Sequence, residues 1–128
     1  MGKRLINWFE IPVADMARAK PFHEAMLGVL LRSETMGPQT MAVFAYSDPA
    51  TGGALLQGPN APRPGPGGTL AYLDAVPDLD RAVARARARA RAAGAEILVP
   101  RFDLPDGMGC FAKLLDLHGN RIGLHALS

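Results

Sequence analysis

Few residues of this 128-residue chain combine a reactive side chain with a predicted strand position. Glu10 lies on an apolar run near the N-terminus, and His125 lies on a similar run close to the C-terminus. A carboxylate and an imidazole can exchange protons with a bound molecule, so the two residues are a candidate catalytic acid/base pair. Two simpler alternatives stay open. Glu10 pairs with an arginine or with backbone at a strand end, and His125 is an ordinary exposed side chain.

The other reactive side chains have structural interpretations. His23 lies on the inner edge of a predicted helix, where we expect it to pack rather than bind a ligand. His118 belongs to a tight-turn sequence, Asp-Leu-His-Gly-Asn, and is expected to be exposed. Cys110 is the single cysteine and cannot form a disulfide within the chain. We therefore expect a small buried thiol and a reducing, cytoplasmic compartment.

Aromatic residues could bind a ligand by stacking instead. Trp8 offers a large flat face if it points into a cavity. The other candidates alternate with small residues on predicted strands and could line the same space: Phe44, Tyr46, Tyr72 and Phe111. Because aromatic side chains on strands also fill cores beneath helices, we expect at least half of these four to be core residues.

The elements that position these residues come from an internal repeat. The pattern Val-x-Asp-Met-x-Arg-Ala at 13–19 returns 63 positions later as Val-x-Asp-Leu-x-Arg-Ala. In each copy an apolar run precedes the pattern and an alanine-rich stretch with helical spacing follows it, which predicts a strand, a capped turn and a helix. Asp15 and Asp78 are the expected helix N-caps. Two copies predict one compact domain with pseudo-twofold symmetry.

Each copy predicts a βαβββ module, and the chain as a whole predicts an α+β fold. Module one, about 1–57, has a strand at 4–13, a helix at about 15–27 and strands near 30–35, 40–46 and 53–57. Module two, about 69–128, has a strand at 69–76, a helix at 78–93 and strands near 95–99, 109–117 and 121–127. A linker at 58–68, rich in glycine and proline, joins them. Residues 1–128 thus form one predicted domain.

Proline qualifies this picture at two points. Pro21 would remove a hydrogen bond inside the first helix, so we expect a separate first turn and a main helix that starts near Lys20. The segment 100–109 has two prolines and two glycines and is predicted to be a loop. It is either a lid over a cleft or a plain surface loop.

Charge and hydropathy give no sign of a nucleic acid or a membrane as partner. The net charge is only +2, and five of the fourteen basic residues lie on one predicted helix, at 81–91. At about 100° per residue the arginines gather on one side of this helix and the apolar residues on the other, which indicates a solvated helix face. No apolar run approaches the roughly 20 residues that span a bilayer.

Three motifs carry a family resemblance: Asn7–Val13, Phe22–Gly28 and Asp116–His125. With the repeat, they resemble a small glyoxalase-like protein of the vicinal oxygen chelate superfamily. That superfamily includes glyoxalases, extradiol dioxygenases, fosfomycin-resistance enzymes and bleomycin-binding proteins. The resemblance implies that the two modules form a cup-shaped, partly open mixed β-barrel with helices outside. It also implies that a small molecule binds inside the cup and that the protein is a homodimer.

In the enzymes of that superfamily, a divalent metal is held by four His, Glu or Gln side chains. The resemblance places these positions at Trp8, at Ala71 or, with a one-residue slip, Leu70, at Gly123, and near Ala54 or Leu55. None of these side chains binds a metal, so no cofactor is expected at the usual centre. Glu10 and His125 lie two residues beyond Trp8 and Gly123 and would face the same cup.

Three functions remain open at the level of the sequence. The first is binding of a small organic molecule in the cup without the usual metal centre. The second is an enzyme of lyase, similar to lactoylglutathione lyase, isomerase or oxygenase type, which uses Glu10 and His125 or a displaced divalent metal. The third is a dimeric accessory module with a vestigial cup.

Overall fold

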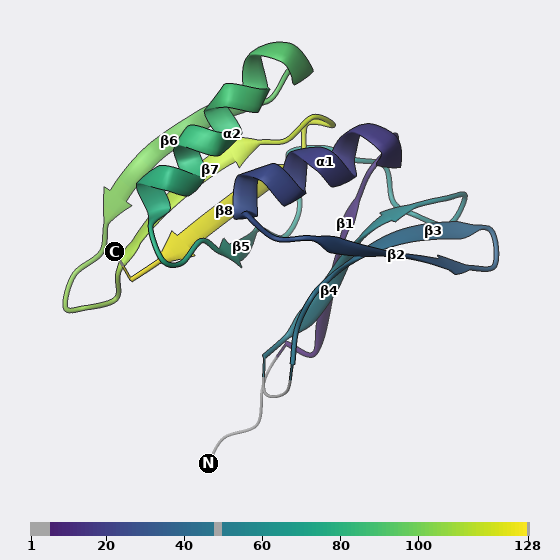
Figure 1. Ribbon diagram of the computed structural model, residues 1–128, viewed down its shortest axis with the longest axis horizontal. Helices are drawn as coiled ribbons and strands as arrows, with labels where there is room; N and C mark the ends of the chain where they lie inside the picture. The colour runs from purple at the N-terminus through teal and green to yellow at the C-terminus, as the bar shows by residue number, and fades with distance from the viewer. Residues whose placement is uncertain (1–5, 48–49, 128) are drawn as a thin grey trace.

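Two βαβββ modules follow one another along the chain (Figure 1). The structure is a computed structural model that describes residues 6–47 and 50–127, without the side chains of residues 90–93. The first module consists of β1 (Trp8–Pro12), α1 (Met16–Leu27), β2 (Leu31–Met36), β3 (Gln39–Phe44) and β4 (Gly52–Gln57). The second consists of β5 (Ala71–Asp74), α2 (Leu79–Ala93), β6 (Glu96–Asp103), β7 (Cys110–Leu115) and β8 (Arg121–Ala126). The predicted α+β class and the order of elements are confirmed.

Each module folds into one mixed four-stranded sheet. The N-terminal sheet has the order β1-β4-β3-β2 and the C-terminal sheet the order β5-β8-β7-β6. In each sheet the first strand runs parallel to the last, and the other pairs are antiparallel. The two sheets are not closed into a barrel, and their arrangement is consistent with a curved, cup-like surface. β1 and β5 are edge strands of the two sheets.

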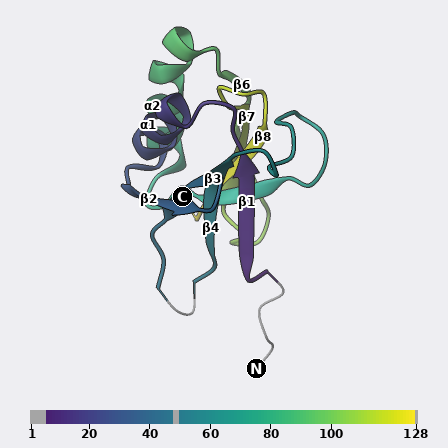
Figure 2. The ribbon, with the colours of Figure 1, turned by 90° about the vertical axis from the view of Figure 1, so that its right-hand side faces the viewer.

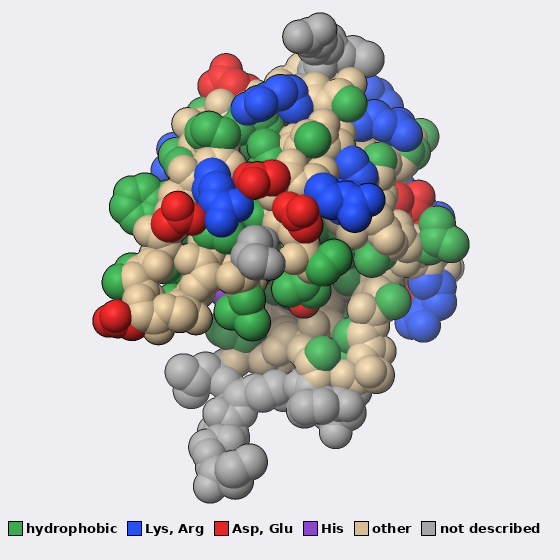
Figure 3. All heavy atoms as spheres, turned by 60° about the vertical axis from the view of Figure 1, so that its left-hand side comes forward, with side chains coloured by type: hydrophobic (Ala, Val, Ile, Leu, Met, Phe, Trp, Pro, Cys, Tyr) green, Lys and Arg blue, Asp and Glu red, His purple; other side chains and the backbone are tan. Residues whose placement is uncertain are grey.

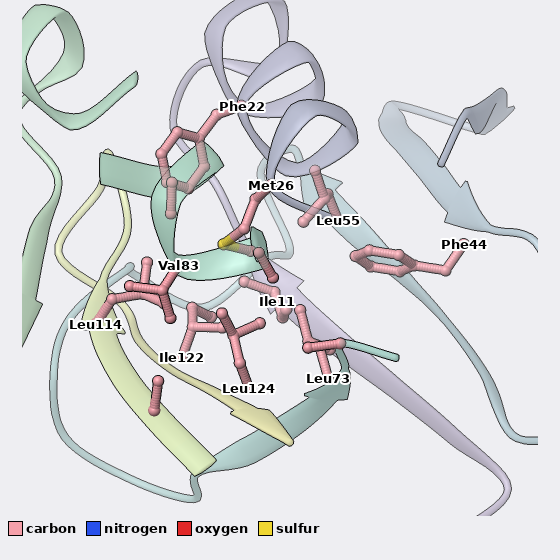
Figure 4. Close-up of a cluster of buried hydrophobic side chains, with 14 of the residues drawn as sticks. Ile11, Phe22, Met26, Phe44, Leu55, Leu73, Val83, Leu114, Ile122 and Leu124 are labelled. Atoms are coloured by element: carbon pink, nitrogen blue, oxygen red, sulfur yellow. The ribbon is translucent and has the colours of Figure 1, made fainter. Parts of the chain in front are cut away.

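One face of each sheet packs beneath the helices, and both modules share a single core (Figure 4). Strand alternation sends every second side chain into this core. The labelled members come from both sheets and both helices: Ile11, Phe22, Met26, Phe44, Leu55, Leu73, Val83, Leu114, Ile122 and Leu124. The face of each sheet that is turned away from the core is called its helix-free face below.

The two modules are also joined by hydrogen bonds. α1 and α2 lie side by side (Figure 2), and Arg85 Nε of α2 donates to the Met26 carbonyl oxygen at 3.1 Å. At the end of β1, Asn120 Nδ2 donates to the Pro12 carbonyl oxygen at 2.6 Å. The Gly65 amide of the linker donates to Asn120 Oδ1 at 3.0 Å. Asn120 therefore connects the second module to both the first module and the linker.

The N-cap prediction is correct for one helix and needs a correction for the other. The Arg81 amide donates to Asp78 Oδ1 at 3.3 Å, as expected of a capping carboxylate. The side chain of Asp15 makes no capping hydrogen bond. Instead, the Met16 amide donates to Gln57 Oε1 at 2.7 Å, so a residue from β4 caps the first turn of α1.

The expected break at Pro21 does not occur. α1 is one continuous helix from Met16 to Leu27, with Pro21 inside it. The proline cannot donate to the carbonyl oxygen of Ala17, four residues earlier. Because both residues are exposed, water can take the place of the missing donor and the helix continues.

The predicted loop at 100–109 is shorter than expected. β6 continues through Pro100 to Asp103, and the loop covers only 104–109. β6 is an edge strand, where a proline costs no interior ladder bond, and its pairing with β7 shifts register on both sides of Val99. The extension puts Phe102 on the sheet.

A polar cluster is buried between α1 and the turn that joins β7 to β8. The Asp116 carboxylate is 1% exposed and accepts hydrogen bonds from the His118 amide and from the Asn120 amide and Nδ2, at 2.9 to 3.1 Å. His118 was expected to be exposed, but it is half-buried, because its Nε2 accepts from the Asp15 amide at 3.1 Å. His23 is fully buried, and its Nε2 lies 3.8 Å from Asp116 Oδ2.

Folding stability should decrease when the pH falls below about 6.5. Burial holds the pKa of His23 below its usual value, against the opposing effects of the Ala19 carbonyl and the Asp116 charge. The unfolded chain therefore takes up a proton on His23 that the folded chain resists. Urea midpoints measured between pH 7.5 and pH 5 should fall for the wild type and fall less for His23→Gln. An equal loss in both proteins would remove His23 from the explanation.

The face that carries α2 mixes charges of both signs with apolar side chains (Figure 3). Arg101 of β6 forms ion pairs with Asp80 Oδ2 at 3.0 Å and with Asp103 Oδ1 at 2.9 Å. None of the helices within the described residues is long and apolar enough to cross a membrane.

Candidate functional site

An aromatic cluster occupies the helix-free face of the N-terminal sheet. Trp8 and Tyr46 meet edge to face, with ring centroids 6.1 Å apart, and they are 40% and 53% exposed. A Cβ atom at Gly52 would lie 2.4 Å from Tyr46 Cε1, so the ring rests on β4 only because that position is glycine. Trp8 Nε1 donates to Glu10 Oε2 at 3.4 Å. We call Trp8 and Tyr46 the N-terminal aromatic patch.

A second cluster occupies the helix-free face of the C-terminal sheet. Phe111 is stacked on Phe102 at 5.2 Å and meets Tyr72 edge to face at 5.8 Å. The Tyr72 ring lies against Gly123, where a Cβ atom would be 2.4 Å from Cδ1. Tyr72 is 45% exposed and Phe102 is 55% exposed. We call Tyr72, Phe102 and Phe111 the C-terminal aromatic patch.

The structure corrects the aromatic prediction at one position and extends it at two. Phe44 lies on the core face, 8% exposed and 5.4 Å from the ring of Phe9, so it cannot line a ligand site. Phe102 and Lys113 were not predicted. Lys113 Nζ lies 5.4 Å from the centroid of Phe111. Its alternation with Phe111 along β7 was a usable signal, whereas Phe102 fell in the segment predicted to be a loop.

Glu10 and His125 lie on different sheets. His125 is paired across the sheet with Asp74 and Phe111 and belongs to the surroundings of the C-terminal patch. Its Nε2 donates to the Met108 carbonyl oxygen at 2.7 Å, which ties the loop 104–109 to β8. Glu10 belongs to the N-terminal patch, and no hydrogen bond or ion pair between described residues connects it to His125. The predicted acid/base pair is therefore not assembled by these contacts.

Backbone hydrogen bonds settle which positions of the two modules correspond. The Val13 amide donates to the Leu56 carbonyl oxygen, and the Ala75 amide donates to the His125 carbonyl oxygen. Val13 therefore corresponds to Ala75, a shift of 62 residues, and Trp8 corresponds to Leu70. Of the two options taken from the sequence, the one-residue slip is correct, because Ala71 pairs with Ile122, a core residue.

These positions do not fit the metal centre that the family resemblance implies. The corresponding four residues are Trp8, Ala54, Leu70 and Gly123, and none has a side-chain atom that binds a divalent cation. Among the described residues, no group of three or more His, Cys, Asp or Glu side chains could hold a metal ion. The ring of Tyr72 covers Gly123 instead.

Two hollows on the described surface lie away from the aromatic patches. One is lined by the turn after β1 and by the linker, from Val13 and Ala14 to Pro64. The other lies between the end of α1 and α2, from Pro21 to Arg89. Neither hollow includes an aromatic residue of the patches. In a single chain, both patches are thus open surfaces.

Solved structures share this fold. The chain matches glyoxalase I from Zea mays, in its E144Q mutant, with a TM-score of 0.70 and 20% identity, covering 94% of this chain and 46% of that one. TnmS3, an antibiotic binding protein from Streptomyces sp. CB03234, matches with a TM-score of 0.63 and 27% identity, over 100% of this chain and 99% of that one. A glyoxalase/bleomycin resistance protein from the same organism matches with a TM-score of 0.62 and 28% identity, over 92% and 96%.

The chain spans less than half the length of the maize enzyme, whereas it spans nearly all of the two Streptomyces proteins. The comparison with curated protein sequences gives no match. The family model for the glyoxalase/bleomycin resistance protein/dioxygenase superfamily matches residues 5–124, which is nearly the whole chain. The chain belongs to the glyoxalase/bleomycin resistance protein/dioxygenase superfamily.

Proposed function

We propose that this protein binds a small, flat organic molecule against its aromatic patches, without a four-ligand metal centre. The observation that carries the proposal is the exchange of chemistry at the family's metal positions. Trp8 and the glycine beneath Tyr72 stand where metal ligands would be needed. Exposed aromatic faces bind flat ligands by stacking and by removing apolar surface from water. The 27% identity to an antibiotic binding protein supports binding rather than turnover.

A second copy of the chain would complete the site. Each sheet carries half of the aromatic residues on its helix-free face, and the side chains remain 40 to 55% exposed in one chain. The maize chain, of which this chain covers 46%, is long enough for two regions of this size. We propose that the N-terminal patch of one copy faces the C-terminal patch of the other, with the ligand between them.

The proposed dimer predicts a molecular mass in solution of twice 13.6 kDa. Light scattering coupled to size exclusion, between about 5 and 100 µM protein, measures it directly. A mass of 13.6 kDa over that whole range would contradict the shared site and would leave each patch to act alone.

Binding itself is tested with a neutral bicyclic probe, 2-naphthamide. Trp8 is the only tryptophan in the chain, so its fluorescence reports on the N-terminal patch directly. The proposal predicts saturable quenching of Trp8 emission and a heat of binding with one common dissociation constant. No saturable signal with this probe and with a panel of larger flat aromatic compounds would favour the accessory module with a vestigial cup.

The enzyme alternative keeps a clear test. A lyase or isomerase that uses Glu10 and His125 should lose activity on a hemithioacetal substrate in both Glu10→Gln and His125→Ala. No contact between the described parts of these two residues favours it, and Glu10 is engaged by Trp8. Activity that both variants lose would overturn the binding proposal in favour of catalysis.

A further inference from the structure

Lys113 is the cation of the C-terminal aromatic patch. It lies on β7, half-buried, with its register neighbours Gly123 on β8 and Val99 on β6. Its ammonium group lies 5.4 Å from the centre of the Phe111 ring, within the range of a cation–π contact. The aromatic face therefore holds its lysine close to the surface on which a ligand would stack.

This lysine has no acidic partner among the described residues, in contrast to Arg101, which pairs with two aspartates. The acids of the helix-free faces are engaged by nearby donors. Asp74 Oδ1 accepts from the Val76 amide at 3.0 Å, and Glu10 Oε2 accepts from Trp8 Nε1. A half-buried ammonium group that lacks a carboxylate retains donors for an incoming anion.

The register of the strands sets where that anion would lie. Tyr72, Gly123 and Lys113 form one row across three neighbouring strands, and the Tyr72 ring covers the glycine in the middle. Residues opposite each other on neighbouring strands are about 5 Å apart. A flat ligand that lies on Tyr72 and Phe111 would thus bring a substituent at its rim within reach of the Lys113 ammonium group.

We infer that Lys113 selects flat aromatic ligands that carry an acidic oxygen substituent, such as a carboxylate or a phenolate. Charge-assisted hydrogen bonds to an ammonium group are about twice as strong as neutral ones, so the acid form should be preferred to a neutral analogue of the same shape. The inference rests on the proposed function, because it assigns the ligand class of the same site.

The test compares two probes that differ only in charge, 2-naphthoate and 2-naphthamide, by calorimetry at pH 7.5. Naphthoate should bind about 10-fold more tightly than naphthamide to the wild type. Lys113→Gln should reduce this preference to within about twofold and leave naphthamide binding unchanged, which shows that the variant is folded. Lys113→Arg should keep the preference. Arg87→Gln, an exposed change of the same charge on α2, should keep it as well.

The outcomes separate the two proposals. Equal binding of both probes by the wild type would overturn the role of Lys113 and leave the binding function standing. A preference for naphthoate that survives in Lys113→Gln would assign the selectivity to another cation. If neither probe binds, both the inference and the proposed function fail for bicyclic aromatic ligands.

Discussion

Replacing Asp116 by alanine is expected to lower the free energy of unfolding by about 3–5 kcal/mol. The carboxylate is 1% exposed and accepts three hydrogen bonds from His118 and Asn120. Alanine would leave those donors buried without a partner, which costs more than the loss of the bonds themselves. Asn120 would also lose the group that orients its contacts with Pro12 and Gly65, so the junction between the modules should weaken.

Urea unfolding followed by circular dichroism measures this effect. The matched control is Asp80→Ala, which removes an exposed aspartate whose ion pair with Arg101 should contribute less than about 1 kcal/mol. A loss below about 1 kcal/mol for Asp116→Ala would show that the buried cluster can rearrange around the missing carboxylate. The importance assigned to the junction would then be incorrect.

Replacing Trp8 by alanine is expected to weaken the binding of 2-naphthamide by about 2–3 kcal/mol, or roughly 30- to 150-fold. Trp8 is the largest ring of the N-terminal patch, and its edge-to-face contact orients Tyr46. Because the side chain is 40% exposed and lies outside the shared core, the free energy of unfolding should change little. The loss should therefore appear in ligand binding and not in folding.

Calorimetry is the suitable measurement, since the variant has no tryptophan fluorescence. Trp8→Phe, which keeps an aromatic face, should bind within about 5-fold of the wild type. A Trp8→Ala protein that binds 2-naphthamide normally would place the ligand elsewhere, and the hollow between α1 and α2 would become the next candidate.

The repeat made the βαβββ order predictable, but it did not fix which strand residues share a face. Phe44 and Tyr46 are two residues apart and were expected on one strand at 40–46. β3 ends at Phe44, so alternation no longer applies to Tyr46. Phe44 packs in the core, whereas the ring of Tyr46 meets Trp8 on the opposite face. Where a strand ends depends on its neighbours in the sheet, and the sequence pattern alone does not contain that information.

The correspondence between the modules was off by one residue for a similar reason. The two helices begin 63 residues apart, at Met16 and Leu79, whereas the first strands correspond at a shift of 62. The repeat that was visible in the sequence covers the turn and the helix, so it carried the helix shift into the strand. Ala71 was consequently named first, although Leu70 occupies the position that corresponds to Trp8.

The burial of His118 could not be predicted from its turn sequence. Gly and Asn mark the turn correctly, but exposure depends on what packs against it. Here the first turn of α1 donates the Asp15 amide to the His118 ring, a contact between residues 103 positions apart. The aromatic patches were predicted in part, because Trp8, Tyr46, Tyr72 and Phe111 were identified and Phe102 was assigned to a loop.

The central claim is that two chains share an aromatic site, and a mixed dimer of two damaged copies tests it most directly. One copy carries Trp8→Ala and the other Tyr72→Ala, each with a different purification tag so that the mixed dimer can be isolated. If the site forms between copies, one site of the mixed dimer is intact and the other has both changes. Calorimetry with 2-naphthamide should then find about half of the sites with wild-type affinity. Two equally weakened sites would show that each chain builds its own site and would contradict the account.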